Sequence, residues 1–72
     1  EIVSVIGNVA LRDDAPFMHI HGTFSDPDMQ VIGGHINRCV VSATCEVSIW
    51  AGEGAMGRKH DEVTGLHLLC NL

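Results

Sequence analysis

Three histidines stand at spacings that suit a metal site: His19, His21 and His35. Side chains alternate faces along a strand, so His19 and His21 are expected on one side, roughly 6.5–7 Å apart. His35 follows the pair Gly33–Gly34, which we expect to turn the backbone sharply and to pass close to a neighbouring segment. Two imidazoles from a strand and a third from a turn can supply three nitrogen ligands to one ion.

A site of this kind has a defined chemistry and a plain alternative. Three imidazole ligands leave a fourth position for water, which zinc acidifies to a pKa of about 7. The alternative is that His19 and His21 lie in a polar strand face, bonded to neighbouring groups and free of metal. The His-x-His spacing taken alone favours this alternative.

An enzyme would also need a general acid or base, for which the candidates are Glu46, Asp61 and Glu62. We expect Glu46 to form a cross-strand pair with Arg58, and Asp61–Glu62 to form a turn that contacts another subunit. No catalytic Ser/His/Asp order, P-loop or dinucleotide-binding glycine pattern is present. The sequence therefore leans against an enzyme and names no catalytic residue.

The elements that must position the histidines are predicted to be strands. Residues Glu1–Leu11 are rich in β-branched side chains, and Gly7 within them predicts a bulge or a close backbone approach. Arg12–Pro16 is expected to form a loop, in which the acids and the proline end the pairing. Phe17–Phe24 is the predicted histidine strand, and Ser25–Asp28 the turn after it.

The second half of the chain is predicted to hold one long strand and a short one. Cys39–Trp50 alternates small or aliphatic residues with polar ones, which is typical of a strand with one buried face. Trp50 is expected to anchor packing there. The remaining segments are a short extended piece, a glycine-rich loop, a charged stretch, a turn and an apolar tail: Met29–Ile32, Ala51–Gly57, Arg58–Glu62, Val63–Gly65 and Leu66–Leu72.

This pattern predicts a mainly antiparallel sheet of four to five strands with no helix to cover it. The chain has 72 residues, of which 46% are hydrophobic, and a lone sheet of this size cannot easily hide so much apolar surface. We therefore expect it to pack against another chain or another segment. The three cysteines, Cys39, Cys45 and Cys70, are expected to be buried free thiols.

The charge limits the partners. The net charge is −5 with four bases, of which only Arg58 and Lys59 are adjacent, whereas binding to phosphates needs clustered bases. DNA therefore remains a candidate partner without support from the charge. No apolar run reaches the ~18 residues of a membrane span, and no basic leader opens the chain. These features predict a cytoplasmic protein with no membrane partner.

Five motifs in a fixed order carry a family resemblance. They are Glu1–Leu11 (EIVSVIGNVAL), Pro16-Phe17-x-His19-x-His21, Val31–His35 (VIGGH), Val40–Val47 (VVSATCEV) and Arg58-x-x-Asp61-Glu62-x-Thr64-Gly65-Leu66. This succession resembles the PPC domain, the family named "plants and prokaryotes conserved". One departure is the link Ile36–Arg38, which is shorter than the family pattern and puts in doubt how the following strand is entered.

The resemblance implies an α+β fold, with a largely antiparallel sheet, a packed helix and assembly as a trimer. It implies that residues 1–72 are the C-terminal portion of a single such domain, with the covering helix missing or supplied by another segment. It further implies that His19, His21 and His35 bind a metal, most simply zinc, as in the prokaryotic branch. The plant branch lacks these histidines and carries separate DNA-binding AT-hooks, whose Arg-Gly-Arg core is absent here.

Taken together, these observations predict a small oligomeric zinc-binding module with no assigned reaction. The runner-up is a DNA-associated regulator, which is the label commonly given to the family. A zinc-dependent hydrolase or lyase acting on a small molecule is the third candidate, and it has the least support.

Overall fold

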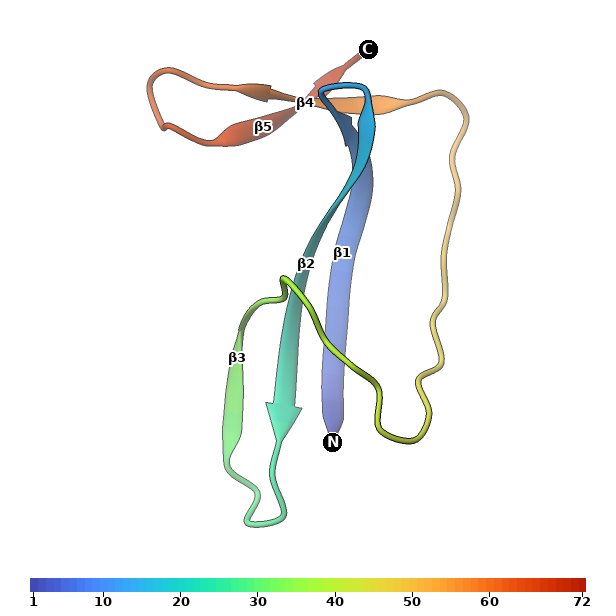
Figure 1. Ribbon diagram of the computed structural model, residues 1–72, viewed down its shortest axis with the longest axis vertical. Coiled ribbons are helices and arrows are strands. Elements are labelled where there is room, and N and C mark those ends of the chain that lie inside the picture. The colour runs from blue at the N-terminus through green and yellow to red at the C-terminus, as the bar shows by residue number, and fades with distance from the viewer. The chain divides into compact units, whose positions relative to one another are not determined.

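The computed structural model describes residues 1–72 and contains five strands and no helix (Figure 1). The strands pair in the order β3-β2-β1-β4-β5 within one sheet. Their bounds are Ile2–Arg12 for β1, Ala15–Ser25 for β2, Val31–His35 for β3, Met56–His60 for β4 and His67–Asn71 for β5. Five strands agree with the expected four to five.

The sheet is mixed, which corrects the prediction of a mainly antiparallel arrangement in one respect. Strand β3 pairs antiparallel with β2, and β5 pairs antiparallel with β4. Strand β4 lies parallel to β1, through the pair Leu11 and Gly57. The long connection between β3 and β4 makes this possible, because a parallel neighbour needs a crossover rather than a tight turn (Figure 1).

The chain divides into two compact units. The first comprises Glu1–Asn8 and His19–Glu46, and the second comprises Val9–Met18 and Val47–Leu72. The histidines His19, His21 and His35 belong to the first unit, together with β3 and residues 19–25 of β2. The β4–β5 hairpin belongs to the second unit.

A two-residue turn connects β1 to β2. Asp13 and Asp14 have φ angles of 51° and 61°, and two consecutive left-handed residues match the twist of a hairpin. The expected loop Arg12–Pro16 is thus shorter than predicted, and Pro16 lies within β2. A two-residue turn directs the Pro16 nitrogen away from β1. On its other side, β2 pairs with β3 only at residues 21–25, so Pro16 has no neighbour to which a backbone hydrogen bond is lost.

The predicted turn after the histidine strand is confirmed. The Asp26 side chain accepts hydrogen bonds from the backbone nitrogens of Asp28 and Gln30, both at 2.9 Å. The backbone closes the same turn, since the Asp26 nitrogen donates to the Gln30 carbonyl at 3.0 Å. This turn sets the register in which β3 returns along β2.

The predicted strand Cys39–Trp50 is not formed. Residues 36–55 connect β3 to β4 without regular secondary structure, and Trp50 is 90% exposed instead of anchoring packing (Figure 1). This segment has the alternation of residue types that is typical of a strand, but a strand also needs a neighbour that satisfies its backbone N–H and C=O groups. No such neighbour is placed beside it.

The end of the chain forms a hairpin that was predicted only as separate pieces. The charged stretch becomes β4 and the apolar tail becomes β5, with Val63 and Thr64 in the turn between them. The Asp61 nitrogen donates to the Leu66 carbonyl at 2.7 Å, and the Gly65 nitrogen donates to the Asp61 carbonyl at 2.8 Å. The turn predicted at Val63–Gly65 is therefore confirmed.

Very little of the chain is buried. Ala10 is the one buried hydrophobic residue, and the exposed large apolar side chains include Ile6, Ile49 and Val63. The cysteines are free as expected, but Cys39 and Cys45 are exposed and Cys70 is half-buried, so the prediction of buried thiols is wrong. No helix in the structure has the length and apolar character needed to cross a membrane.

Candidate metal centre

Two neighbouring strands bring the three histidines together. His19 and His21 come from β2 and share a face, as the strand periodicity predicts, and His35 ends β3 directly opposite His21. The expectation that His35 follows a sharp turn is wrong. Gly33 and Gly34 continue β3 and pair with Thr23 and Gly22.

The glycines still allow the close approach that was expected of them. A Cβ atom at Gly33 would lie 2.9 Å from the Gly22 carbonyl oxygen, which is too close for any side chain. Gly34 has a φ of 154°, a value that residues with a side chain rarely adopt. The Gly-Gly pair therefore lets β3 lie tightly against β2. The register of these two strands then places His35 opposite His21.

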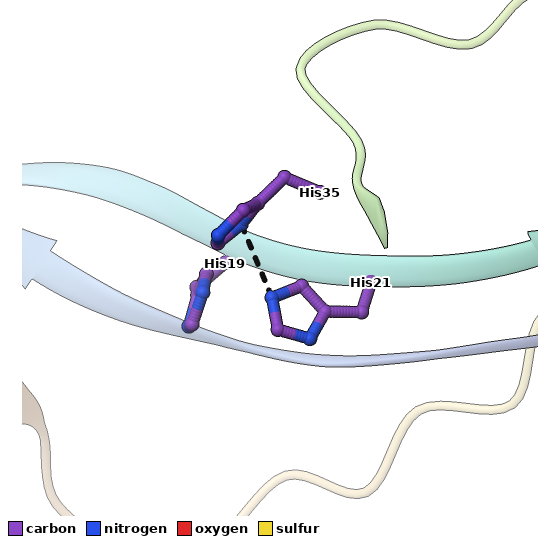
Figure 2. Close-up of side chains that lie close together, drawn as sticks. All are labelled: His19, His21 and His35. Atoms are coloured by element: carbon purple, nitrogen blue, oxygen red, sulfur yellow. Dashed lines mark hydrogen bonds between the residues drawn. The ribbon is translucent and has the colours of Figure 1, made fainter. Parts of the chain in front are cut away.

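The three imidazole rings lie next to one another (Figure 2). Ring centroids are 4.9 Å apart for His19 and His21, 5.2 Å for His19 and His35, and 4.3 Å for His21 and His35. The Nε2 atom of His21 and the Nδ1 atom of His35 are hydrogen-bonded at 3.1 Å, as the dashed line in Figure 2 shows. One nitrogen of each ring lies within 4.8 Å of the others.

These distances can be compared with the geometry that a metal requires. Imidazole nitrogens that bind zinc at ~2.0–2.1 Å in a tetrahedral arrangement are about 3.3 Å apart, with ring centres roughly 4.5–5.2 Å apart. The 3.1 Å between the His21 and His35 nitrogens is close to that value, and their ring centroids, 4.3 Å apart, lie slightly closer than chelation needs. The widest nitrogen separation exceeds it by about 1.5 Å, which a rotation of one side chain can supply. The donor set fits a divalent ion.

The surroundings leave the site accessible. His21 and His35 are exposed and His19 is half-buried, so a fourth ligand can approach from solvent. The hydrogen bond between His21 and His35 needs one ring nitrogen that donates and one that accepts. A metal ion binds the neutral rings through such acceptor lone pairs, so it would replace the shared proton of this pair.

Strand β1 lies beside β2 in the sheet and approaches it closely at Gly7, which has no side chain. A Cβ atom at Gly7 would collide with the His19 carbonyl oxygen, and it would lie 2.9 Å from the Ile20 Cα atom. The expected close backbone approach at Gly7 is thus confirmed. The contact fixes the β2 backbone between the two histidines of that strand.

The opposite face of the hairpin is apolar. A Cβ atom at Gly22 would lie 2.6 Å from Cδ1 of Ile36 and 2.7 Å from the Phe24 ring, so both side chains cover this glycine. The Ile36 nitrogen extends the ladder by donating to the Ile20 carbonyl at 2.9 Å. The imidazoles therefore project from one face of the hairpin, and on the other face Ile36 and Phe24 cover Gly22 while Met18 and Ile32 stay exposed.

The carboxylates considered for catalysis lie elsewhere. Glu46 is exposed in the segment without strands, so the expected cross-strand pair with Arg58 cannot form there. Asp61 and Glu62 belong to the β4–β5 hairpin, where Asp61 Oδ2 accepts bonds from the Thr64 hydroxyl at 2.7 Å and the Thr64 nitrogen at 2.9 Å. These bonds, led by that from the hydroxyl, lower the pKa of Asp61 below its ordinary value. The turn role expected for Asp61 is confirmed.

The structure contains a second pair of neighbouring histidines that the sequence did not predict. His60 and His67 are direct partners on β4 and β5, with ring centroids 5.2 Å apart. Neither residue belongs to a motif that the sequence singled out as a ligand. The signal that could have found the pair is a short turn predicted between two strands, which would have placed the histidines opposite each other.

A comparison with protein families shows which family the chain belongs to. The model of the Plants and Prokaryotes Conserved (PCC) domain, abbreviated PPC above, matches residues 1–52. The chain belongs to the PCC domain family. The match contains all three clustered histidines and four of the five motifs, whereas the fifth motif, Arg58–Leu66, lies outside it. No curated protein and no solved structure matches the chain.

Proposed function

We propose that this PCC domain is a metal-binding module in which His19, His21 and His35 hold one divalent ion, zinc. The observation that carries the proposal is the register between β2 and β3. It places His35 opposite His21, while strand periodicity adds His19 on the same face. Three nitrogen donors with an open side form the ligand set of a zinc site that retains one exchangeable position.

Each histidine has a distinct part in this proposal. His21 and His35 form the pair that is already near ligand spacing, and His19 completes the set after a small movement of its ring. Bound zinc would supply a Lewis acid whose remaining position accepts water or an anionic group. Because the cluster contains no carboxylate, we assign the module no reaction and keep the zinc hydrolase or lyase as the least supported candidate.

The decisive experiment measures the metal content of the protein purified without added metal, by mass spectrometry. We expect close to one zinc per chain in the unaltered protein, and almost none in a His19→Ala/His21→Ala variant. The matched control is His60→Ala/His67→Ala, which removes two histidines from the other hairpin and should leave that zinc in place. Absence of metal from the unaltered protein, even after zinc is offered, would overturn the proposal.

The binding should also depend on pH. Imidazole binds metal only when it is neutral, so protons compete with zinc for the three rings and acidification should release the ion. Dialysis against buffers of decreasing pH, followed by metal analysis, measures this release. A zinc content that did not change on acidification would contradict ligation by the imidazoles.

A DNA-associated regulator is the competing function, since the family is commonly labelled in that way. Its electrostatic requirement is a cluster of bases, and the chain has four bases against nine acids. A mobility-shift titration with duplex DNA at several salt concentrations separates the two functions. Binding that weakens steeply with salt would favour the regulator, and its absence would leave the metal module.

The assembly belongs to the same proposal. We place residues 1–72 as the C-terminal portion of one PCC domain that assembles as a trimer in the cytoplasm, with further sequence or neighbouring chains covering the exposed apolar side chains. The single buried hydrophobic residue, Ala10, supports this, because a chain without its own core gains stability from such contacts. Light scattering coupled to size exclusion would give the mass of the assembly.

A further inference from the structure

The β4–β5 hairpin carries a histidine pair built like the core of the first site. His60 and His67 face each other across the ladder, just as His21 and His35 do. In each hairpin the adjoining residue pair makes a backbone bond, from Ile36 to Ile20 at 2.9 Å and from Asp61 to Leu66 at 2.7 Å. Both histidine pairs therefore occupy positions without backbone bonds between partners, where opposite side chains come closest.

The spacing of the second pair already suits chelation. Two imidazoles that share one ion at ~2.0–2.1 Å have ring centres roughly 4.5–5.2 Å apart. The separation of 5.2 Å between His60 and His67 falls at the upper end, and it equals that between His19 and His35. The rings are inclined by 64°, so their edges, which carry the nitrogens, are not stacked face to face.

The local charge does not oppose a cation. Arg58 and Lys59 precede His60, and Asp61 and Glu62 follow it, so the nearby formal charges cancel. The two carboxylate residues line the same shallow depression as His60 and Lys59. His60 is exposed and His67 is half-buried, which leaves the pair open to an ion from solvent.

We propose that His60 and His67 form a second metal-binding position, a two-imidazole chelate for a divalent transition-metal ion that links β4 to β5. Two protein ligands leave the remaining positions to water, so this position binds more weakly than the three-histidine site. Affinity for nitrogen ligands rises toward copper along the first-row series, so Cu²⁺ binds most tightly and Zn²⁺ less so. An ion that bridges the strands stabilises the hairpin in proportion to its occupancy.

The test uses the whole chain with His19→Ala/His21→Ala, because Cu²⁺ would otherwise displace zinc from the three-histidine site. Cu²⁺ is added in small steps while the imidazole proton resonances of the three remaining histidines are followed by NMR. We expect the signals of His60 and His67 to broaden first and together. In calorimetry on the same variant, a further His60→Ala change should weaken Cu²⁺ binding at least tenfold, because one imidazole replaces a chelate.

The matched control is Lys59→Ala, which removes a neighbouring charge and leaves both imidazoles in place. It should keep or slightly strengthen Cu²⁺ binding. The proposal fails if the resonances of His60 and His67 do not broaden together, or if adding His60→Ala leaves Cu²⁺ binding as tight as in the parent His19→Ala/His21→Ala variant. Because zinc occupancy of the first site is measured separately, failure here is distinguishable from failure of the three-histidine site.

Discussion

The β2–β3 and β4–β5 hairpins each carry a cross-strand histidine pair, and only the first adds a third imidazole on the same face. In β2–β3 a cross-strand histidine pair, His21 and His35, is joined by His19 two residues earlier on the same face. In β4–β5 the pair His60 and His67 has Arg58 at the equivalent position, with its Nη1 atom donating to the His67 carbonyl at 2.8 Å. In the proposed scheme, one position, two residues before a paired histidine, separates a three-ligand site from a two-ligand chelate.

Removing the third imidazole should have the largest effect. A His19→Ala variant keeps the His21–His35 pair, so its zinc affinity should fall to the level of the His60–His67 pair. A structural zinc site contributes ~10–16 kcal/mol over four ligands, so one ligand corresponds to a loss on the order of 100-fold. Competition with a chromogenic chelator measures this change. An affinity unchanged in His19→Ala would mean that His19 is not a ligand.

The reverse change should convert the weaker hairpin. Arg58→His places a histidine two residues before His60, which reproduces the His-x-His spacing of β2 opposite a third imidazole. We expect zinc affinity at this hairpin to rise at least tenfold, measured by calorimetry in a variant that also carries His19→Ala/His21→Ala. Arg58→Ala is the control, because it removes the bond to His67 without adding a ligand. Equal affinities in both variants would contradict the prediction.

The backbone beneath the first site gives a smaller effect. Gly7→Ala drives a methyl group into the backbone of His19 and Ile20, which cannot move without disturbing the strand pairing. We expect a loss of stability of about 1–3 kcal/mol, together with weaker zinc binding. Thermal unfolding with and without zinc measures both.

Gly22→Ala is the matched comparison for Gly7→Ala. Its methyl group meets the side chains of Ile36 and Phe24, which can rotate away. The φ angle of Gly22 is not positive, so alanine can adopt the same backbone conformation. The loss should therefore be smaller, and zinc binding should be nearly unchanged. If Gly22→Ala proved the more damaging of the two, the contacts of Ile36 and Phe24 around Gly22 would matter more than the approach of β1.

The smallest effect concerns the turn of the second hairpin. Hydrogen bonds from Thr64 lower the folded-state pKa of Asp61, so its carboxylate stabilises the turn above its ordinary pKa of 3.8. That contribution should disappear as pH falls below 3.8 through the lowered folded value. Amide exchange at Gly65 and Leu66 should report the loosening. In Asp61→Asn the change with pH should be absent, and a retained change would assign the effect to another carboxylate.

The sequence anticipated the first hairpin better than the second. Strand periodicity put His19 and His21 on one face, and the signals Asp26–Pro27 and Gly7 gave the turn and the close approach. The failures share a cause, because each depended on a partner strand. Cys39–Trp50 has the residue pattern of a strand, but no neighbour supplies its backbone bonds. His60 and His67 were missed because only the register between β4 and β5 sets them opposite each other.

The sequence by itself therefore determined the local facts about this protein: the family, the residue types, and which side chains share a strand face. Those facts follow from sterics and from a period of two, which need no knowledge of distant residues. The tertiary structure alone decided which imidazoles meet. The pairing of His21 with His35 and of His60 with His67 depends on backbone hydrogen bonds between strands, and a slip of one residue would send one member of each pair to the other face.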